Sequence, residues 1–135
     1  MPPLPTVGGS SGTWGTELNT WLLTSHNVDG TLKEVEQNTP TASYTLTLVD
    51  AGKVVEMNVA SANNLTVPPA ASVAFPIGTI IEVMQLGAGQ TTIVAGSGVT
   101  IRSPSGKLKL TGQYSSVSLR KRATNEWTLI GDITL

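Results

Sequence analysis

The sequence has no cysteine and only one histidine. Without cysteine the chain can form neither a disulfide nor a thiolate metal site. His26 stands alone, so a histidine-rich metal site or a Ser-His-Asp triad would need distant partners. We expect His26 to be solvated or to cap a turn. We therefore predict no catalytic residue, no cofactor and no metal, and we expect that the protein is not an enzyme.

Charge is also scarce, at 13 % of residues with a formal net charge of −1. That balance gives no reason to expect a nucleic-acid partner or an anionic membrane. No apolar run approaches the roughly 20 residues that cross a bilayer. The start, Met1–Pro5, has neither the basic nor the apolar region of a signal peptide. We predict no nucleic-acid partner and no membrane partner.

Residues 41–135 are rich in the threonine, serine, glycine and valine that favour short strands and tight turns. The run Thr79–Leu86 is bounded by glycines and predicts a strand buried on both faces. Thr91–Ala95 is expected to return as its hairpin partner, with φ > 0 at Gly87 and Gly89. This hairpin is the predicted centre of a β domain.

Alternation and turn signals predict further strands around that centre. They are Tyr44–Val49, Lys53–Val59, Leu65–Val67, Val99–Arg102, Lys107–Leu110, Tyr114–Arg122 and Glu126–Ile130. Asp50–Gly52 is expected to close a hairpin between the first two, and Trp127 is assigned to the core. Strands this short and this frequent are typical of an antiparallel β-sandwich or barrel, so the predicted fold class is all-β. No period of 20–50 residues repeats, so a solenoid is not expected.

Residues 1–40 differ from the rest because they hold a proline-rich start, a Gly8–Gly12 link and an amphipathic segment. Apolar residues recur at i, i+4, i+7 and i+8 of that segment, which predicts one short helix with Thr13 as its N-cap. Such a helix is too short to be stable alone, so its apolar face must pack on its own β domain, a neighbouring copy or a larger assembly. We take 1–40 as an N-terminal attachment arm and 41–135 as the β domain. The predicted partner-binding residues are Trp14, Leu18, Trp21 and Leu22.

Two carboxylates and one basic cluster are the charged groups that could carry chemistry. Glu82 lies in the middle of a predicted strand, and Glu56 likewise alternates with apolar residues in another predicted strand. A buried pair would suggest acid catalysis, but outward-facing or neutralised strand residues are more common. The cluster Arg120–Arg122 is interpreted as a strand end that faces solvent or an acidic partner. Trp14, Trp21 and Trp127 leave a sugar-binding interpretation open.

Residues 4–33 carry a proline, a glycine-rich link, Gly-Thr-Trp-Gly, Leu-Asn and then His-Asn-Val-Asp-Gly-Thr-Leu-Lys. This string, about a quarter of the chain, resembles an N-terminal segment of bacteriophage tail-fibre-like and head-surface proteins. The later strings are similar to a small β module of phage fibre and head-decoration proteins. They are Leu65–Pro69, Phe75–Thr79, Gln85–Gln90, Gln113–Leu119 and Asn125–Asp132.

The resemblance implies a homotrimer on the surface of a virion, with the major capsid protein or another virion protein as partner. The function we expect from it is that of a structural protein, a capsid decoration or head-fibre protein. The alternative is a tail-fibre or tail-tip protein that binds a receptor or carbohydrate. Neither the trimer nor the location follows from composition or periodicity.

Overall fold

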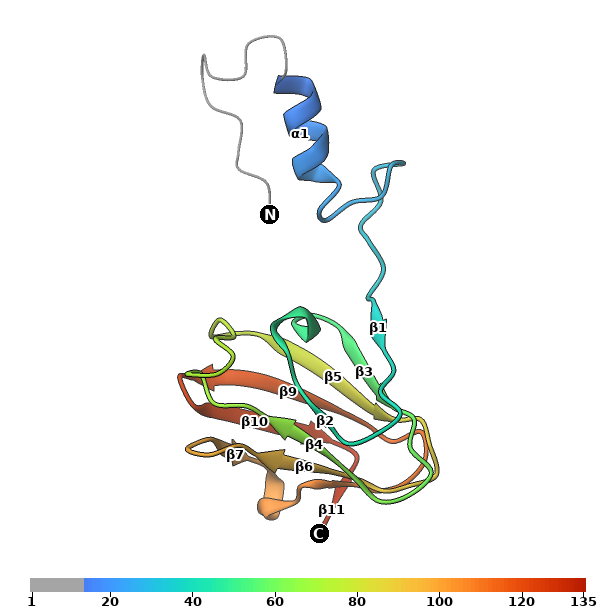
Figure 1. The fold of residues 1–135 in the computed structure, drawn as a ribbon, viewed down its shortest axis with the longest axis vertical. Coiled ribbons are helices and arrows are strands. Elements are labelled where there is room, and N and C mark those ends of the chain that lie inside the picture. The colour runs from blue at the N-terminus through green and yellow to red at the C-terminus, as the bar shows by residue number, and fades with distance from the viewer. Residues whose placement is uncertain (1–13) are drawn as a thin grey trace. The chain divides into compact units, whose positions relative to one another are not determined.

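The protein is described by a computed structural model that covers residues 14–135, except for the side chains of Trp14, Glu17 and Trp21. The chain divides into two units, Met1–Glu34 and Val35–Leu135, which we call the helical unit and the β unit. The described part of the helical unit contains the helix α1 (Trp14–Leu22). The β unit is built from two sheets, so the all-β prediction is confirmed (Figure 1).

The strands of the β unit fall into one sheet of six and one of five. The six-stranded sheet runs β1 (Gln37–Asn38), β3 (Val54–Met57), β5 (Ile80–Gln85), β9 (Ser116–Ala123), β10 (Glu126–Gly131) and β7 (Thr100–Arg102). The five-stranded sheet runs β11 (Ile133–Thr134), β8 (Lys109–Leu110), β6 (Thr91–Ala95), β4 (Asn63–Val67) and β2 (Tyr44–Thr45). Two 3₁₀ turns complete the unit, η1 (Leu48–Asp50) and η2 (Pro104–Gly106).

From β1 to β6 the chain winds from one sheet to the other and back, so that odd strands lie in one sheet and even strands in the other. Each strand therefore pairs in parallel with the strand two elements later, as β3 does with β5 and β4 with β6. Val54 pairs with Glu82 and Leu65 pairs with Ile93, which is the same offset of 28 residues in both sheets. Residues 37–95 thus form three stacked coils.

This winding corrects three sequence predictions. Thr79–Leu86 and Thr91–Ala95 do not pair as a hairpin, because β5 and β6 lie in different sheets, and the same holds for β2 and β3. The sheets are mixed, because the coils pair in parallel while β5–β9, β9–β10, β6–β8 and β8–β11 are antiparallel. By contrast, β9 and β10 do form an antiparallel hairpin, which turns through Thr124 and Asn125.

The glycines after β5 have a different role from the one predicted. Neither Gly87 nor Gly89 has a positive φ. Instead, a Cβ on Gly87 would collide with the backbone of Val59, and one on Gly89 would collide with the backbone of Ser61. The Gly89 N–H donates to the Val59 carbonyl at 2.9 Å. These glycines are therefore needed because successive coils touch backbone to backbone at this corner.

The core lies between the two sheets, where strands contribute every second residue. Its buried apolar members are Leu46, Val55, Met57, Leu65, Val67, Phe75, Ile81, Val83, Ile93, Leu110, Val117, Leu119, Trp127 and Leu129. The Trp127 ring meets Phe75 edge-on with centroids 5.4 Å apart, which confirms the core assignment of Trp127. The strand β5 is buried on one face only, contrary to the prediction, because Ile80 and Glu82 are exposed between buried neighbours.

Candidate partner-binding surface

The helix α1 ends at Leu22 and leads into a tight turn. The Leu23 N–H donates to the Asn19 carbonyl at 3.0 Å, and the His26 N–H donates to the Leu22 carbonyl at 2.9 Å. At nine residues the helix has about two and a half turns, so it is marginally stable in isolation. Its predicted N-cap, Thr13, lies outside the described residues.

After the helix, residues 25–33 form a small antiparallel loop. The Lys33 N–H donates to the Ser25 carbonyl at 3.0 Å, and His26 and Leu32 form an isolated bridge. At its tip the Gly30 φ is +85°, a conformation that glycine adopts without steric cost. The backbone N–H and hydroxyl of Thr31 donate to an Asp29 carboxylate oxygen at 3.0 and 2.7 Å. The hydroxyl and backbone hydrogen bonds from Thr31 lower the pKa of Asp29.

Within this unit, the described apolar side chains remain largely open to solvent. Leu22 and Leu23 are 36 % and 41 % exposed, Val28 is 94 % exposed and Leu32 is 72 % exposed. Leu18 is half-buried. Five apolar residues within fifteen positions therefore lack the burial that their chemistry favours, which is the usual mark of an interaction surface.

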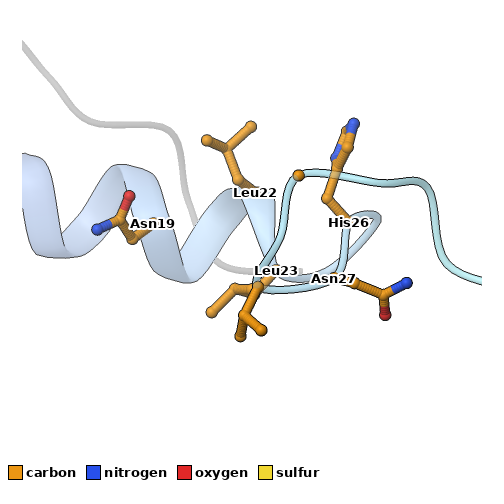
Figure 2. A pocket seen from close by; sticks show the side chains of 7 residues that line it. Asn19, Leu22, Leu23, His26 and Asn27 are labelled. Carbon is orange, nitrogen blue, oxygen red and sulfur yellow. The ribbon is translucent and has the colours of Figure 1, made fainter.

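A pocket of about 440 Å³ opens among these residues, at the end of α1. Its lining residues are Asn19, Leu22, Leu23, His26, Asn27, Val28 and Gly30. Figure 2 shows Leu22 and His26 extending to the same side of the ribbon. The His26 Nδ1 lies 2.9 Å from the Ser25 hydroxyl. We call the exposed apolar residues and this pocket the helix-end surface, defined by Leu18, Leu22, Leu23, His26, Val28 and Leu32.

Of the four predicted partner-binding residues, the structure describes the side chains of Leu18 and Leu22, and both belong to the helix-end surface. The side chains of Trp14 and Trp21 lie outside the described residues. Sequence reasoning missed Leu23, Val28 and Leu32. A signal for the last two was present, since Val28 and Leu32 flank the Asp-Gly turn and such turns are solvent-exposed.

Glu56 and Glu82 do not form the buried carboxylate pair that acid catalysis would need. Glu56 and Glu82 lie on the outer face of the six-stranded sheet, on neighbouring strands. Glu82 is exposed and accepts a hydrogen bond from the Ser116 hydroxyl at 2.8 Å. Their outward position agrees with the plainer interpretation given above.

The buried carboxylate is Asp50, which the sequence analysis did not single out. It accepts hydrogen bonds from the Asn38 amide and the Tyr44 hydroxyl at 2.9 Å, and from the Thr47 N–H at 2.8 Å. These donors come from β1, β2 and the residue before η1. Asp50 therefore stabilises the first coil by linking β1 and β2, which is a structural role.

The basic cluster is divided between the two faces of β9. Arg120 and Arg122 are exposed, whereas Lys121 is buried and its Nζ donates to the Phe75 carbonyl at 2.7 Å. Lys121 thereby ties the loop before β5 to the sheet. The expectation of a solvent-facing cluster is thus wrong for Lys121, because strand alternation turns every second residue inward.

Among residues 14–135, no group of three or more His, Asp or Glu side chains is placed to hold a metal ion. In the same part of the chain, no helix is long and apolar enough to cross a bilayer. Comparison with protein-family models, curated proteins and solved structures gives no match to this chain. The helix-end surface is the feature of the described residues that most directly indicates an interaction.

Proposed function

We propose that this protein is a structural component of a bacteriophage virion, a trimeric decoration or head-fibre protein attached to the particle surface. The resemblance of residues 4–33 and of the β-domain strings to phage proteins supports the proposal. In it, the helical unit is the attachment arm, and the β unit projects from the surface or bridges capsid subunits. The partner is the major capsid protein or another virion protein.

The observation that carries the proposal is the contrast in apolar burial between the two units. The β unit buries fourteen apolar residues in a core of its own. The helix-end surface leaves Leu22 exposed at the end of a helix too short to be stable alone, together with Leu23 and Val28 in the turns that follow it. A segment of this kind gains stability by burying those residues against a partner.

The decisive experiment compares particles with and without the protein. Binding only to the assembled shell stabilises that shell by mass action. We expect particles that lack the protein to adsorb to cells normally, but to release their genome at lower temperature or after osmotic shock. Heat-stable particles that fail to adsorb would overturn the decoration proposal in favour of a tail-tip adhesin.

The attachment role of the arm has its own test. Leu22→Ala removes apolar surface from the helix-end surface, whereas Thr20→Ala truncates an exposed polar residue of the same helix. We expect Leu22→Ala to lower the amount of protein retained on purified particles about fivefold or more, since burying a leucine contributes about 1.5–3 kcal/mol. Thr20→Ala should leave retention unchanged. Equal retention of the two variants would show that attachment does not use this surface.

A further inference from the structure

The outer face of the six-stranded sheet carries apolar side chains at positions that face solvent, where polar side chains would be expected. Ile80 and Ile130 are 53 % and 63 % exposed, and Val54 and Met84 are only half-buried. A groove of about 300 Å³ runs beside them over β5, β9 and β10, floored by small residues such as Ser116 and Ser118. We call this the β5–β9 face. It comprises Val54, Glu56, Ile80, Glu82, Met84, Ser116, Ser118, Arg120, Thr128 and Ile130.

The charges on the β5–β9 face are separated by sign. Glu56 and Glu82 lie on β3 and β5, and Arg120 lies on β9. Nearby, Arg102 and Arg122 are already paired with Glu126 at 3.4 and 3.3 Å. Among residues 14–135, neither Glu56 nor Arg120 makes an ion pair. Within the same residues, Glu82 makes no ion pair either, although it accepts the hydrogen bond from Ser116. Glu56 and Arg120 therefore lie on opposite sides of the same face without a charged partner in the described part of the chain.

Glu56 and Arg120 cannot pair within one chain. In the sheet register, Glu56 lies opposite Met84 and Arg120 lies opposite Ile80, with β5 between their strands. Two strand spacings of about 4.8 Å and four residues of about 3.3 Å place their backbones about 16 Å apart. Their side chains do not bridge that distance, but those of two adjacent molecules can meet.

We propose that the β5–β9 face is the contact between copies of this chain, and that Glu56 of one copy meets Arg120 of the next. The inference rests on the trimer of the proposed function and assigns its interface. Opposite charges on the two sides make the face complementary to itself. The exposed isoleucines and the groove between those charges supply the apolar area that such a contact buries.

The register also selects the symmetry of the contact. In a face-to-face two-fold dimer that joins Glu56 to Arg120 twice, the axis passes through the midpoint between them. That midpoint is Glu82, which lies on β5 halfway between Met84 and Ile80. Glu82 would then face its own copy, and juxtaposed like charges are unfavourable. A cyclic trimer avoids this, because each copy presents its β3 side to the β9 side of its neighbour.

The test reverses the two charges in the purified full-length chain and measures the assembly mass by sedimentation equilibrium. Glu56→Arg and Arg120→Glu should each weaken association about tenfold or more, because each places like charges in contact. The chain carrying both reversals should recover the trimer. Lys109→Glu changes charge by the same amount as Arg120→Glu, but on the exposed face of the five-stranded sheet, and should leave the trimer intact.

Mixing the two single variants tests the cyclic arrangement itself. A ring with an odd number of members cannot alternate the two variants, so one like-charge contact always remains in a trimer. The mixture should therefore recover less trimer than the double variant. Full recovery as a mixed dimer would overturn the cyclic contact and support a two-fold one.

The remaining outcomes separate this inference from the proposed function. If the wild-type chain is a trimer and each single reversal variant is a trimer of equal stability, the β5–β9 face is not the interface, although the trimer itself stands. A wild-type chain that sediments as a monomer at micromolar concentration would refute both. If a reversal prevents folding, as judged by circular dichroism, Glu56→Gln and Arg120→Gln test the same contact by a smaller loss of association.

Discussion

The helical unit and the β unit use apolar residues in opposite ways. The β unit has a hydrophobic core around Trp127 and Leu119, which are both buried. The helical unit leaves most of its described apolar side chains exposed, with Val28 the extreme case. Because burial of apolar surface is the main source of folding free energy, stability resides in the β unit. The helical unit retains apolar surface that a partner can bury.

The largest expected effect separates the two units by their response to truncation. Trp127→Ala removes a buried ring and its edge-on contact with Phe75, so we expect the β unit to lose about 3–5 kcal/mol of unfolding free energy. Leu22→Ala should change the same quantity by less than about 0.5 kcal/mol. Urea unfolding followed by circular dichroism measures both, because Trp127→Ala removes the tryptophan of the β unit. A large loss from Leu22→Ala would mean that the two units fold as one.

A second prediction probes the stacked coils within the β unit. Gly89→Ala places a methyl group against the backbone of Ser61, which cannot move without disturbing the coil, so we expect a loss of about 1–3 kcal/mol. Gly112→Ala is the matched control, because Gly112 has an ordinary φ and open space around its Cα. The control should be neutral or slightly stabilising. Equal melting temperatures for the two variants would contradict the close approach of the coils.

The smallest expected effect is a difference in pH response. Hydrogen bonds from Thr31 lower the pKa of Asp29, so their stabilisation of the turn is present above the unfolded value of about 3.9 and is lost as pH falls through the folded value. In the β unit, the hydrogen bond to Glu36 raises the pKa of Lys53, with the Nζ 2.8 Å from the carboxylate. That stabilisation is full below the unfolded value of about 10.4 and is lost as pH rises through the folded one.

Amide chemical shifts across a pH titration report these two sites separately. The Thr31 amide should move at acidic pH and the residues around Lys53 at alkaline pH. Asp29→Asn should abolish the acidic change and leave the alkaline one. An acidic transition that persists in Asp29→Asn would assign it to another group.

Much of the strand content of the β unit was available from the sequence. The run Thr91–Ala95 matches β6, and the alternation of Val117 and Leu119 with serines gave the inward face of β9. These features are local, because a strand with one buried face repeats every two residues. The helix around Leu18 was equally visible from its apolar spacing.

The pairing of the strands was not available, because turn chemistry does not say whether a chain turns back beside itself or crosses to another sheet. Gly87 to Gln90 has the composition of a hairpin loop, yet it leads from β5 to the opposite sheet. The offset of 28 residues also left little trace. Between 54–67 and 82–95, only Val55 with Val83 and Ala60 with Ala88 are identical. Stacked coils need matching shape rather than matching sequence, so a search for repeats fails here.

The candidate surfaces were predictable to a lesser degree. The apolar spacing around Leu22 indicated a binding helix. The exposure of Leu23 and Leu32 depends instead on how the rest of the helical unit packs, which the spacing does not show. The separation of Glu56 from Arg120 requires the register of three strands, two of them 60 residues or so apart in the chain. No local pattern contains that information.

The position of β9 at the middle of the six-stranded sheet has a consequence for how the protein is made. β5 emerges from the ribosome early but must wait for Ser116–Ala123, its antiparallel neighbour, before its second edge is covered. Contacts of such long sequence separation slow folding and leave strand edges open meanwhile. The three coils are thus completed by strands that are translated after them. A chain interrupted before β9 would present an unpaired edge, ready to join another chain rather than to fold.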